Sequence, residues 1–393
     1  MVEKPLDFAT LAVHAGEDPC PATGALDTPI YQSTTFVSAD ADEMAAVYGE
    51  QKPGYMYTRY GNPTIHALES KLAALEGGEA ALATASGMAA VSTAILGYVK
   101  TGDHVVAARS LYGATYNFLN RKLPRMGASA TFVDSARVED FEKALKPNTR
   151  LIYFETPSNP VLEVVDIAAV AALGLARGIP TMLDNTFASP ALQQPLRMGA
   201  TVSVHSATKY LCGHGDAMGG AIIGPRDYIS LLVHEVIRDF GGVISPFNAW
   251  LILRGIRTLH LRMPAHCSNA RQIAEFLAAH RNVEHVYYPG LPHHRGHEVA
   301  KKQMSDFGAM ISFEAKGGYE GGKQVMDRVK LFARAASLGD TRSLILHPAS
   351  TSHRAVPPED RRAIGITDGL VRLSVGIEAA ADLIADLDQA LQF

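Results

Sequence analysis

The apolar residues of the chain first follow a clear helical period after Pro63. Four of them recur at steps of three, four and three residues: Ile65, Leu68, Leu72 and Leu75. This spacing places them on one face of a helix. Gly77 and Gly78 follow, and because glycine is common just beyond helix ends, we predict that the helix ends there.

Beyond this helix, short apolar runs alternate with helical patterns. Five runs are typical of buried strands: residues 104–108, 130–134, 150–155, 181–185 and 201–206. Helical patterns such as residues 140–145 and 166–178 separate them. Near-continuous apolar strands alternating with helices indicate a parallel sheet covered on both faces. Sites on such sheets lie at the carboxyl ends of the strands, where we expect Asp184 and residues 206–209.

The two ends of the chain have different patterns. Residues 1–60 are rich in Pro and Gly with little helical periodicity. We therefore expect an irregular arm that either has a function or is held in place by a partner. After about residue 258, a long helical stretch and fewer strands indicate a smaller α+β domain. We therefore expect three parts: an arm (1–60), an α/β domain (61–258) and a C-terminal α+β domain (259–393).

Composition narrows the class of protein. With 47% hydrophobic and 19% charged residues, the chain of 393 residues is too apolar to be disordered. Its formal charge of −4 and the absence of long Lys/Arg runs disfavour a nucleic-acid partner. No apolar stretch reaches the roughly 20 residues of a membrane span, and the N-terminus does not resemble a secretory signal. We expect a cytoplasmic protein without nucleic-acid or membrane partners.

The segment that says most about chemistry is residues 204–220, VHSATKYLCGHGDAMGG. It places Lys209 just after an apolar strand, beside the hydroxyls of Ser206 and Thr208. Burial lowers the pKa of such a lysine, and its amine can form a Schiff base with a carbonyl cofactor, most often pyridoxal phosphate. The two hydroxyls could bind the phosphate. An ordinary lysine at a strand end is the alternative, and this segment alone does not exclude it.

Two further segments favour the same cofactor. Residues 84–96 indicate a strand that ends at Ser86, followed by a helix whose first turn has small residues, so the backbone of Gly87 and Met88 could bind a phosphate. Asp184 follows another apolar run and could pair with the pyridinium nitrogen. Each feature also has an ordinary structural explanation, a strand-to-helix turn or a helix-capping aspartate. Three such features in one α/β pattern favour the cofactor.

The chain resembles the Cys/Met-metabolism family of pyridoxal-phosphate-dependent enzymes over nearly its whole length. The matching motifs occur in the family's order: YTRYGNPT (57–64), ASGM (85–88), SLYGAT (110–115), ETPSNP (155–160), DNTF (184–187), HSATKY (205–210), SLGD (337–340) and RLSVG (372–376). The resemblance implies the aminotransferase-like fold, fold type I, in which a mainly parallel sheet carries the cofactor and a smaller α+β domain follows.

The resemblance also implies how pyridoxal 5'-phosphate is bound. Lys209 would hold it covalently, and Asp184 would pair with its pyridinium nitrogen. The phosphate would be bound by Ser206, Thr208 and the backbone of Gly87 and Met88, completed from the neighbouring subunit by Tyr57 and Arg59. The implied assembly is a homotetramer built from active dimers, which would give the arm a partner.

The substrate residues follow from the same resemblance. Tyr112 would stack on the cofactor ring and act as the acid–base at the leaving group. Arg372 would clamp the substrate α-carboxylate through its planar guanidinium, assisted by Ser337 and Asn159. No metal is expected.

The implied reaction is γ-elimination on sulfur amino acids, most simply the cleavage of L-methionine to α-ketobutyrate, ammonia and methanethiol. Residues 204–216 are similar to methionine γ-lyases, and Arg238-Asp239 stands where those enzymes have a Lys-Asp pair. Two features point elsewhere: residues 245–250 look more like a sulfhydrylase, and Ala114 stands where methionine γ-lyases usually have cysteine. An O-acetyl- or O-succinylhomoserine sulfhydrylase is therefore the alternative, and cystathionine γ-lyase is third.

Other motifs do not change this interpretation. A nicotinamide dehydrogenase would need a GxGxxG after an early strand, which is lacking. Residues 317–323 have P-loop-like spacing, but Gln324 replaces the required Ser/Thr, so we expect an exposed connection. Three histidines near Pro292 and Gly296 are expected to be solvated in a loop: His293, His294 and His297. Cys212 is expected to be a packing residue.

Overall fold

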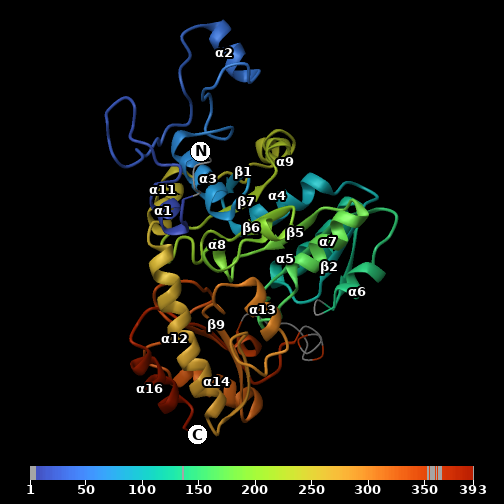
Figure 1. Ribbon diagram of the computed structural model, residues 1–393, viewed down its shortest axis with the longest axis vertical. Helices are drawn as coiled ribbons and strands as arrows, with labels where there is room; N and C mark the ends of the chain where they lie inside the picture. The colour runs from blue at the N-terminus through green and yellow to red at the C-terminus, as the bar shows by residue number, and fades with distance from the viewer. Residues whose placement is uncertain are drawn as a thin grey trace.

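Two sheets, each covered by helices, lie one after the other along the longest axis of the molecule (Figure 1). The coordinates are a computed structural model that describes residues 6–134, 137–351, 354, 359, 361 and 365–392. The first five residues of the arm and the last residue of the chain therefore lie outside the described part. Among the described helices, none is both long and apolar enough to cross a membrane.

The larger sheet has seven strands in the order β1-β7-β6-β5-β4-β2-β3. They are β1 (Ala80–Thr84), β2 (His104–Ala108), β3 (Ser129–Val133), β4 (Thr149–Glu155), β5 (Thr181–Asp184), β6 (Val202–His205) and β7 (Gly220–Gly224). Among the seven strands, β7 alone runs opposite to the others. The predicted parallel sheet is confirmed, and β7 is the strand that the apolar pattern did not indicate. The carboxyl ends of β1, β4, β5 and β6 therefore lie at one edge.

Helices cover both faces of this sheet. They are α3 (Pro63–Glu76), α4 (Gly87–Tyr98), α5 (Gly113–Asn117), α6 (Val138–Lys143), α7 (Ile167–Arg177), α8 (Ser189–Leu192), α9 (Arg226–Leu232), α10 (Arg238–Phe240) and α11 (Pro246–Ile256). The predicted helix α3 begins with the side chain of Asn62 accepting a bond from Thr64 N, and it ends at Gly77 with a left-handed φ of 73°. One apolar core joins α4, α7 and α9 to the sheet, and another joins α3 and α11 to the C-terminal half.

The smaller sheet has the strand order β10-β11-β12-β9-β8 and is mostly antiparallel. Its strands are β8 (Val283–Tyr287), β9 (Met310–Ala315), β10 (Ala333–Arg334), β11 (Leu344–Leu346) and β12 (Leu370–Ser374). The helices of this half are α12 (Leu259–Ala279), α13 (His297–Gln303), α14 (Gly318–Arg328) and α16 (Ala380–Ala390). The α+β character of this half agrees with the prediction, whereas the boundary at residue 258 stays a prediction.

Residues 317–323 were expected to form an exposed connection; residues 317–320 and 323 are exposed, but the expectation of a connection is wrong. Most of this segment forms the first turns of α14, and Gly321 and Gly322 are buried. A Cβ atom at Gly322 would lie 2.7 Å from the ring of His347. The glycines therefore allow a helix to pack closely, and they do not form a loop.

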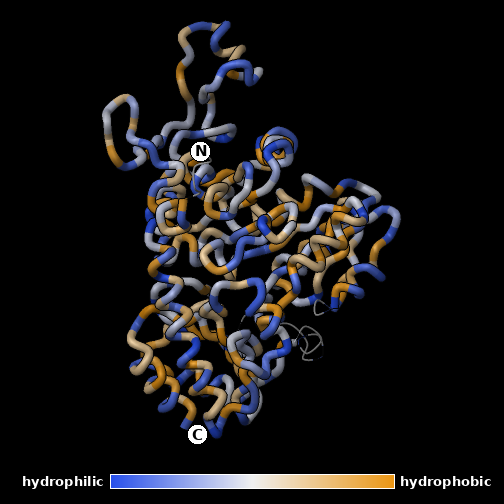
Figure 2. The backbone as a smooth tube through the Cα atoms, viewed as in Figure 1, coloured by the Kyte–Doolittle hydropathy of each residue, from blue (hydrophilic) through white to orange (hydrophobic). Residues whose placement is uncertain are grey.

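The N-terminal arm contains two short helices, α1 (Phe8–His14) and α2 (Ala41–Tyr48), in a region expected to be irregular. The start of the arm is anchored by Lys71 of α3, whose buried Nζ donates to Ala12 O and pairs with Glu17 at 2.6 Å. Farther along, the arm projects away from the two sheets (Figure 1). Figure 2 shows apolar stretches along this projecting part, in which Val37 is 99% exposed.

Candidate active site

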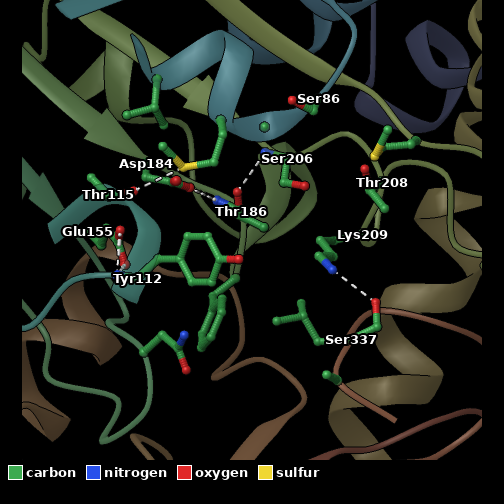
Figure 3. Close-up of a pocket in the computed structure, with 18 of the residues that line it drawn as sticks. Ser86, Tyr112, Thr115, Glu155, Asp184, Thr186, Ser206, Thr208, Lys209 and Ser337 are labelled. Carbon is green, nitrogen blue, oxygen red and sulfur yellow. Dashed lines mark hydrogen bonds between the residues drawn. The ribbon is translucent and has the colours of Figure 1, made fainter. Parts of the chain in front are cut away.

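A cavity of about 320 Å³ lies at the carboxyl ends of β4, β5 and β6, the edge where the site was expected (Figure 3). It also borders the first turn of α4 and residues of the C-terminal half. The predicted residues that line it are Gly87, Met88, Tyr112, Asn159, Asp184, Ser206, Thr208, Lys209, Ser337 and Arg372. The fold thus brings together residues that are far apart in sequence.

Lys209 lies in the turn after β6 and reaches across the cavity to the C-terminal half. Its Nζ donates a hydrogen bond to Ser337 Oγ at 2.9 Å. Burial lowers the pKa of Lys209 to about 8, and the positive charge of Arg372 adds to this effect. Lys209 has no carboxylate partner among the described residues. It is therefore a buried amine with a substantial neutral fraction, as a nucleophilic lysine requires.

Asp184 ends β5 and points into the cavity. Burial raises the pKa of its carboxyl group, and the hydrogen bond from Thr186 N at 2.9 Å offsets part of that effect. Thr186 Oγ1 accepts in turn from Ser206 N at 2.8 Å, which joins the ends of β5 and β6. Thr186 had no predicted role. Its only signal is the Asp-x-Thr spacing of a side-chain-stabilised turn.

The first turn of α4 forms one wall of the cavity. Ser86 caps this helix by accepting from Ala89 N at 3.1 Å, and the first amides of a helix have no partner within it. Gly87 lies so close to β6 that a Cβ atom there would be 2.7 Å from Ser206 Cβ. Helix amides and the hydroxyls of Ser206 and Thr208 thus surround one space suited to an anion.

Tyr112 stands at the start of α5, and its side chain is 49% exposed. Figure 3 shows the ring reaching into the cavity, with its hydroxyl on the side of Lys209. Its backbone N–H donates to both carboxyl oxygens of Glu155, each at 2.9 Å. Glu155 is a second residue without a role in the sequence analysis. The only sequence features that pointed to Glu155 were its place at the end of an apolar run and at the start of the motif ETPSNP (155–160).

Arg372 of β12 closes the cavity from the C-terminal half. Its Nη1 donates to Asn159 Oδ1 at 2.9 Å and its Nη2 to Ser337 O at 3.1 Å. The residue is 8% exposed, and burial lowers the pKa of the guanidinium to about 10. It forms no ion pair within the described part of the chain. A buried guanidinium without a counter-ion suits a carboxylate ligand.

Tyr57 and Arg59 do not reach this cavity in their own chain. They line a separate one of about 390 Å³, where the Arg59 guanidinium stacks 5.4 Å from the ring centre of Tyr57. Arg238 lies in the same region, over the ring of Tyr60 and paired with Glu50 at 3.1 Å. Ala114 is also not among the residues that line the cavity around Lys209, which is called the catalytic cavity below.

The structure changes the expectation for the three histidines and agrees with the one for Cys212. His294 and His297 are half-buried, with burial lowering the pKa of His294 to about 4, so only His293 is solvated as predicted. No group of three or more metal-binding side chains occurs among the described residues. Cys212 is buried, and burial raises the pKa of its thiol, which fits the predicted packing role.

Known proteins resemble the chain over its full length. The family described as Cys/Met metabolism PLP-dependent enzyme matches residues 9–392. An L-methionine γ-lyase from Fusobacterium nucleatum subsp. polymorphum is 48% identical over 100% of both chains. Another from Porphyromonas gingivalis is 49% identical over 98% of this chain and 96% of its own. An O-succinylhomoserine sulfhydrylase from Pseudomonas aeruginosa is 43% identical over 98% and 95%.

Among solved structures, a Campylobacter jejuni protein described as an O-acetylhomoserine (thiol)-lyase superposes with a TM-score of 0.95 at 35% identity. The match covers 99% of this chain and 100% of that one, and that structure contains N'-pyridoxyl-lysine-5'-monophosphate. The cavity fits such a group: it has one buried amine in Lys209, a carboxyl in Asp184, and the start of α4 at Gly87, where a Cβ atom would clash with Ser206.

Proposed function

The chain belongs to the Cys/Met metabolism family of pyridoxal-phosphate-dependent enzymes, and on that premise we propose that it is a carbon–sulfur lyase that acts on L-methionine. It splits L-methionine, with one water, into α-ketobutyrate, ammonia and methanethiol. The full-length relatives that are 48% and 49% identical, both L-methionine γ-lyases, support this choice of reaction.

One observation carries the proposal. Two buried cations, Lys209 and Arg372, face a single cavity, and neither has a carboxylate partner in the described part of the chain. Arg372 then binds the α-carboxylate of an amino acid in a bidentate manner, while Asn159 and Ser337 hold the guanidinium in place. The amine of Lys209 lies beside this anchor, where it binds pyridoxal phosphate covalently.

The other predicted residues complete the cofactor site. Asp184 pairs with the pyridinium nitrogen, and the phosphate is bound by Ser206, Thr208 and the amides of Gly87 and Met88. The bound cofactor supplies a ring that stores the negative charge withdrawn from the substrate. Once the amine of the substrate has displaced it, the freed amine of Lys209 removes the proton from Cα, and Tyr112 donates a proton to the sulfur that leaves Cγ. The hydroxyl of Tyr112 lies on the side of Lys209, which supports these roles (Figure 3).

The active unit is a dimer, and two dimers form a cytoplasmic homotetramer. Tyr57 and Arg59 complete the phosphate site of the neighbouring subunit, and residues 1–60 hold the two subunits together. Two features support this: Arg59 does not line the cavity of its own chain, and the projecting arm exposes apolar residues such as Leu26, at 79%, and Val37. Residues 61–258 bind the cofactor and residues 259–393 supply Arg372.

A homoserine-ester sulfhydrylase is the second candidate, and cystathionine γ-lyase is the third. Two sequence features favour the sulfhydrylase: Ala114, where methionine γ-lyases usually have cysteine, and residues 245–250, SPFNAW. The full-length relative at 43% identity favours it as well. The proposed site residues are the same for all three reactions. The three candidates therefore differ only in the group that leaves Cγ and in whether a sulfur nucleophile replaces it.

A product assay tests the proposal. Purified protein should develop a visible cofactor band, lost in Lys209→Ala, and should release α-ketobutyrate and methanethiol from L-methionine. L-Cystathionine, and O-acetyl-L-homoserine with sulfide, are assayed side by side. Homocysteine formation from the ester, with L-methionine left intact, would replace the lyase proposal by the sulfhydrylase one. A protein that binds no pyridoxal phosphate would remove both.

A further inference from the structure

Two carboxyl groups lie side by side at the ends of adjacent strands of the candidate active site. Glu155 is the last residue of β4 and Asp184 the last of β5. The two residues are paired in the register of these parallel strands, so their side chains emerge on the same face. Both line the catalytic cavity.

Burial raises the pKa of both carboxyl groups, and each accepts a backbone N–H, but the surroundings of Asp184 favour a charge more than those of Glu155 do. Asp184 accepts a hydrogen bond from Thr186 N, and the nearby His205 also favours its anionic form. Glu155 is 5% exposed and has no cationic partner among the residues that the structure describes. Burial and the proximity of Asp184 raise the pKa of Glu155 well above its usual range. Two adjacent buried carboxyls do not both ionise near neutral pH, as in paired catalytic aspartates.

The remaining charged groups of the cavity do not change this assignment. Lys209 and Arg372 repel each other, neither contributes to the shifted pKa of Glu155, and Figure 3 places Lys209 across the cavity from Glu155. Tyr153 precedes Glu155 on the same face of β4, and burial raises the pKa of its hydroxyl well above the usual range, so it adds no charge.

Glu155 also holds the backbone of the residue that is expected to stack on the cofactor. Both of its oxygens lie 2.9 Å from Tyr112 N. Helix α5 has five residues, and the side chain of Tyr112 makes no capping hydrogen bond at its start. Because the ring of Tyr112 is half exposed, this backbone contact does much to fix where the ring lies.

We propose that Glu155 is a positioning residue that acts in its uncharged form: it fixes the backbone of Tyr112 and leaves Asp184 as the single anion facing the cofactor ring. The inference rests on the proposed function, because it assigns the partners of Asp184 and Tyr112. It extends that function to a residue that contacts neither the phosphate nor the carboxylate anchor.

The test compares Glu155→Gln, which keeps an uncharged acceptor, with Glu155→Ala, which removes it. We expect Glu155→Ala to lower kcat about 10–100-fold and to weaken the visible circular dichroism of the bound cofactor, because the ring of Tyr112 shifts. Glu155→Gln should restore both signals to within about 3-fold of wild type. It should also leave the pH midpoint of the visible band unchanged, because no charge is lost. If the alanine variant does not fold, the activity and the pH midpoint of the glutamine variant still test whether Glu155 acts in its uncharged form.

The matched control is Asp184→Asn, the same carboxyl-to-amide change on the adjacent strand, which should shift that midpoint or abolish the band. A glutamine variant as damaged as the alanine variant, or one whose midpoint moves by about a unit, would mean that Glu155 works as an anion and would overturn this inference alone. A wild-type protein without a cofactor band would overturn the proposed function and this inference together.

Discussion

At the scale of single residues, the candidate site is marked by ionisable groups that the fold buries without an opposite charge beside them. Lys209 and Arg372 lie on one side of the cavity, and Glu155 and Asp184 lie on another. Burying an unpaired charge costs several kcal/mol, so such groups persist where a ligand compensates them. The α-carboxylate of an amino acid would compensate Arg372, and the pyridinium nitrogen of the cofactor would compensate Asp184.

The two buried cations predict a pH dependence for cofactor uptake. In protein freed of cofactor, the rate of pyridoxal phosphate uptake should rise with pH through a midpoint near 8, because only the neutral amine of Lys209 is a nucleophile. Arg372→Leu should move this midpoint upward, since the guanidinium disfavours a second positive charge. The midpoint should stay well below 10.5, because burial is the larger cause of the lowered pKa.

Stopped-flow absorbance at a series of pH values measures this uptake. The exposed Arg281→Leu is the control and should leave the midpoint in place. An Arg372→Leu midpoint equal to that of wild type would show that the two cations do not interact.

At the scale of helices and strands, the apolar pattern predicted the buried elements and missed the short exposed helices α1 and α2 and the antiparallel strand β7. The five apolar runs correspond to β2–β6 within one residue at each end. Four of these strands are buried on both faces, and β3, at the edge of the sheet, is only partly buried. β7 was missed because Gly220 and Gly224 at its ends look like turn residues. α1 and α2 each bury a single residue and so lack an apolar period, although Asp7 and Asp40 cap them.

The same limit applies to the candidate site. Lys209 and Asp184 could be proposed from sequence because their side-chain chemistry, placed after apolar strands, already suggests a cofactor. Glu155 and Thr186 act through the backbone amides of other residues, and the contact between Glu155 and Tyr112 joins positions 43 residues apart. No local spacing encodes such a contact.

The close contact between Gly87, at the start of α4, and Ser206, just after β6, leads to a prediction about cofactor binding. Gly87→Ala should weaken pyridoxal phosphate binding about 10-fold or more, because the new Cβ would lie 2.7 Å from Ser206 Cβ and push α4 away from β6. The fold should survive, since alanine favours a helix over glycine by up to about 1 kcal/mol. Equilibrium titration of cofactor-free protein measures this affinity. Gly49→Ala, with φ −82° and no contact under 3.4 Å, is the control, and equal affinities in the two variants would contradict the argument.

Behind the sheet, a buried carboxylate holds the ends of β5 and β6 together. Oε1 of Glu76 accepts from Asn185 Nδ2 and Ser203 Oγ, both at 2.9 Å, and pairs with His205. We expect Glu76→Ala to lower the free energy of unfolding by about 3–5 kcal/mol, because it leaves these donors buried without an acceptor. Thermal unfolding should show a clear drop in Tm, with the exposed Glu298→Ala as control. A Tm equal to that of the control would mean that water replaces the carboxylate.

At the scale of the whole molecule, the described chain provides one cavity that holds the candidate catalytic residues and a second, remote region that holds Tyr57 and Arg59. An arm that projects from the two sheets and exposes Leu26 and Val37 is costly for an isolated monomer. The proposed symmetric dimer would account for both features, because an isologous interface would place the arm of each subunit against its partner. In that proposal the two regions would form one site, contributed by two chains.

This arrangement predicts complementation between two inactive variants. Arg59→Ala and Lys209→Ala should each be nearly inactive, yet unfolding and refolding them together should restore activity. In a mixed dimer, one site combines an intact Lys209 with the partner's intact Arg59, and the other site lacks both. Random pairing makes about half of the dimers mixed, each with one of its two sites restored, so the mixture should reach about a quarter of wild-type activity per chain. If both residues acted within one chain, every chain would lack one of them, and the mixture would be as inactive as the parents.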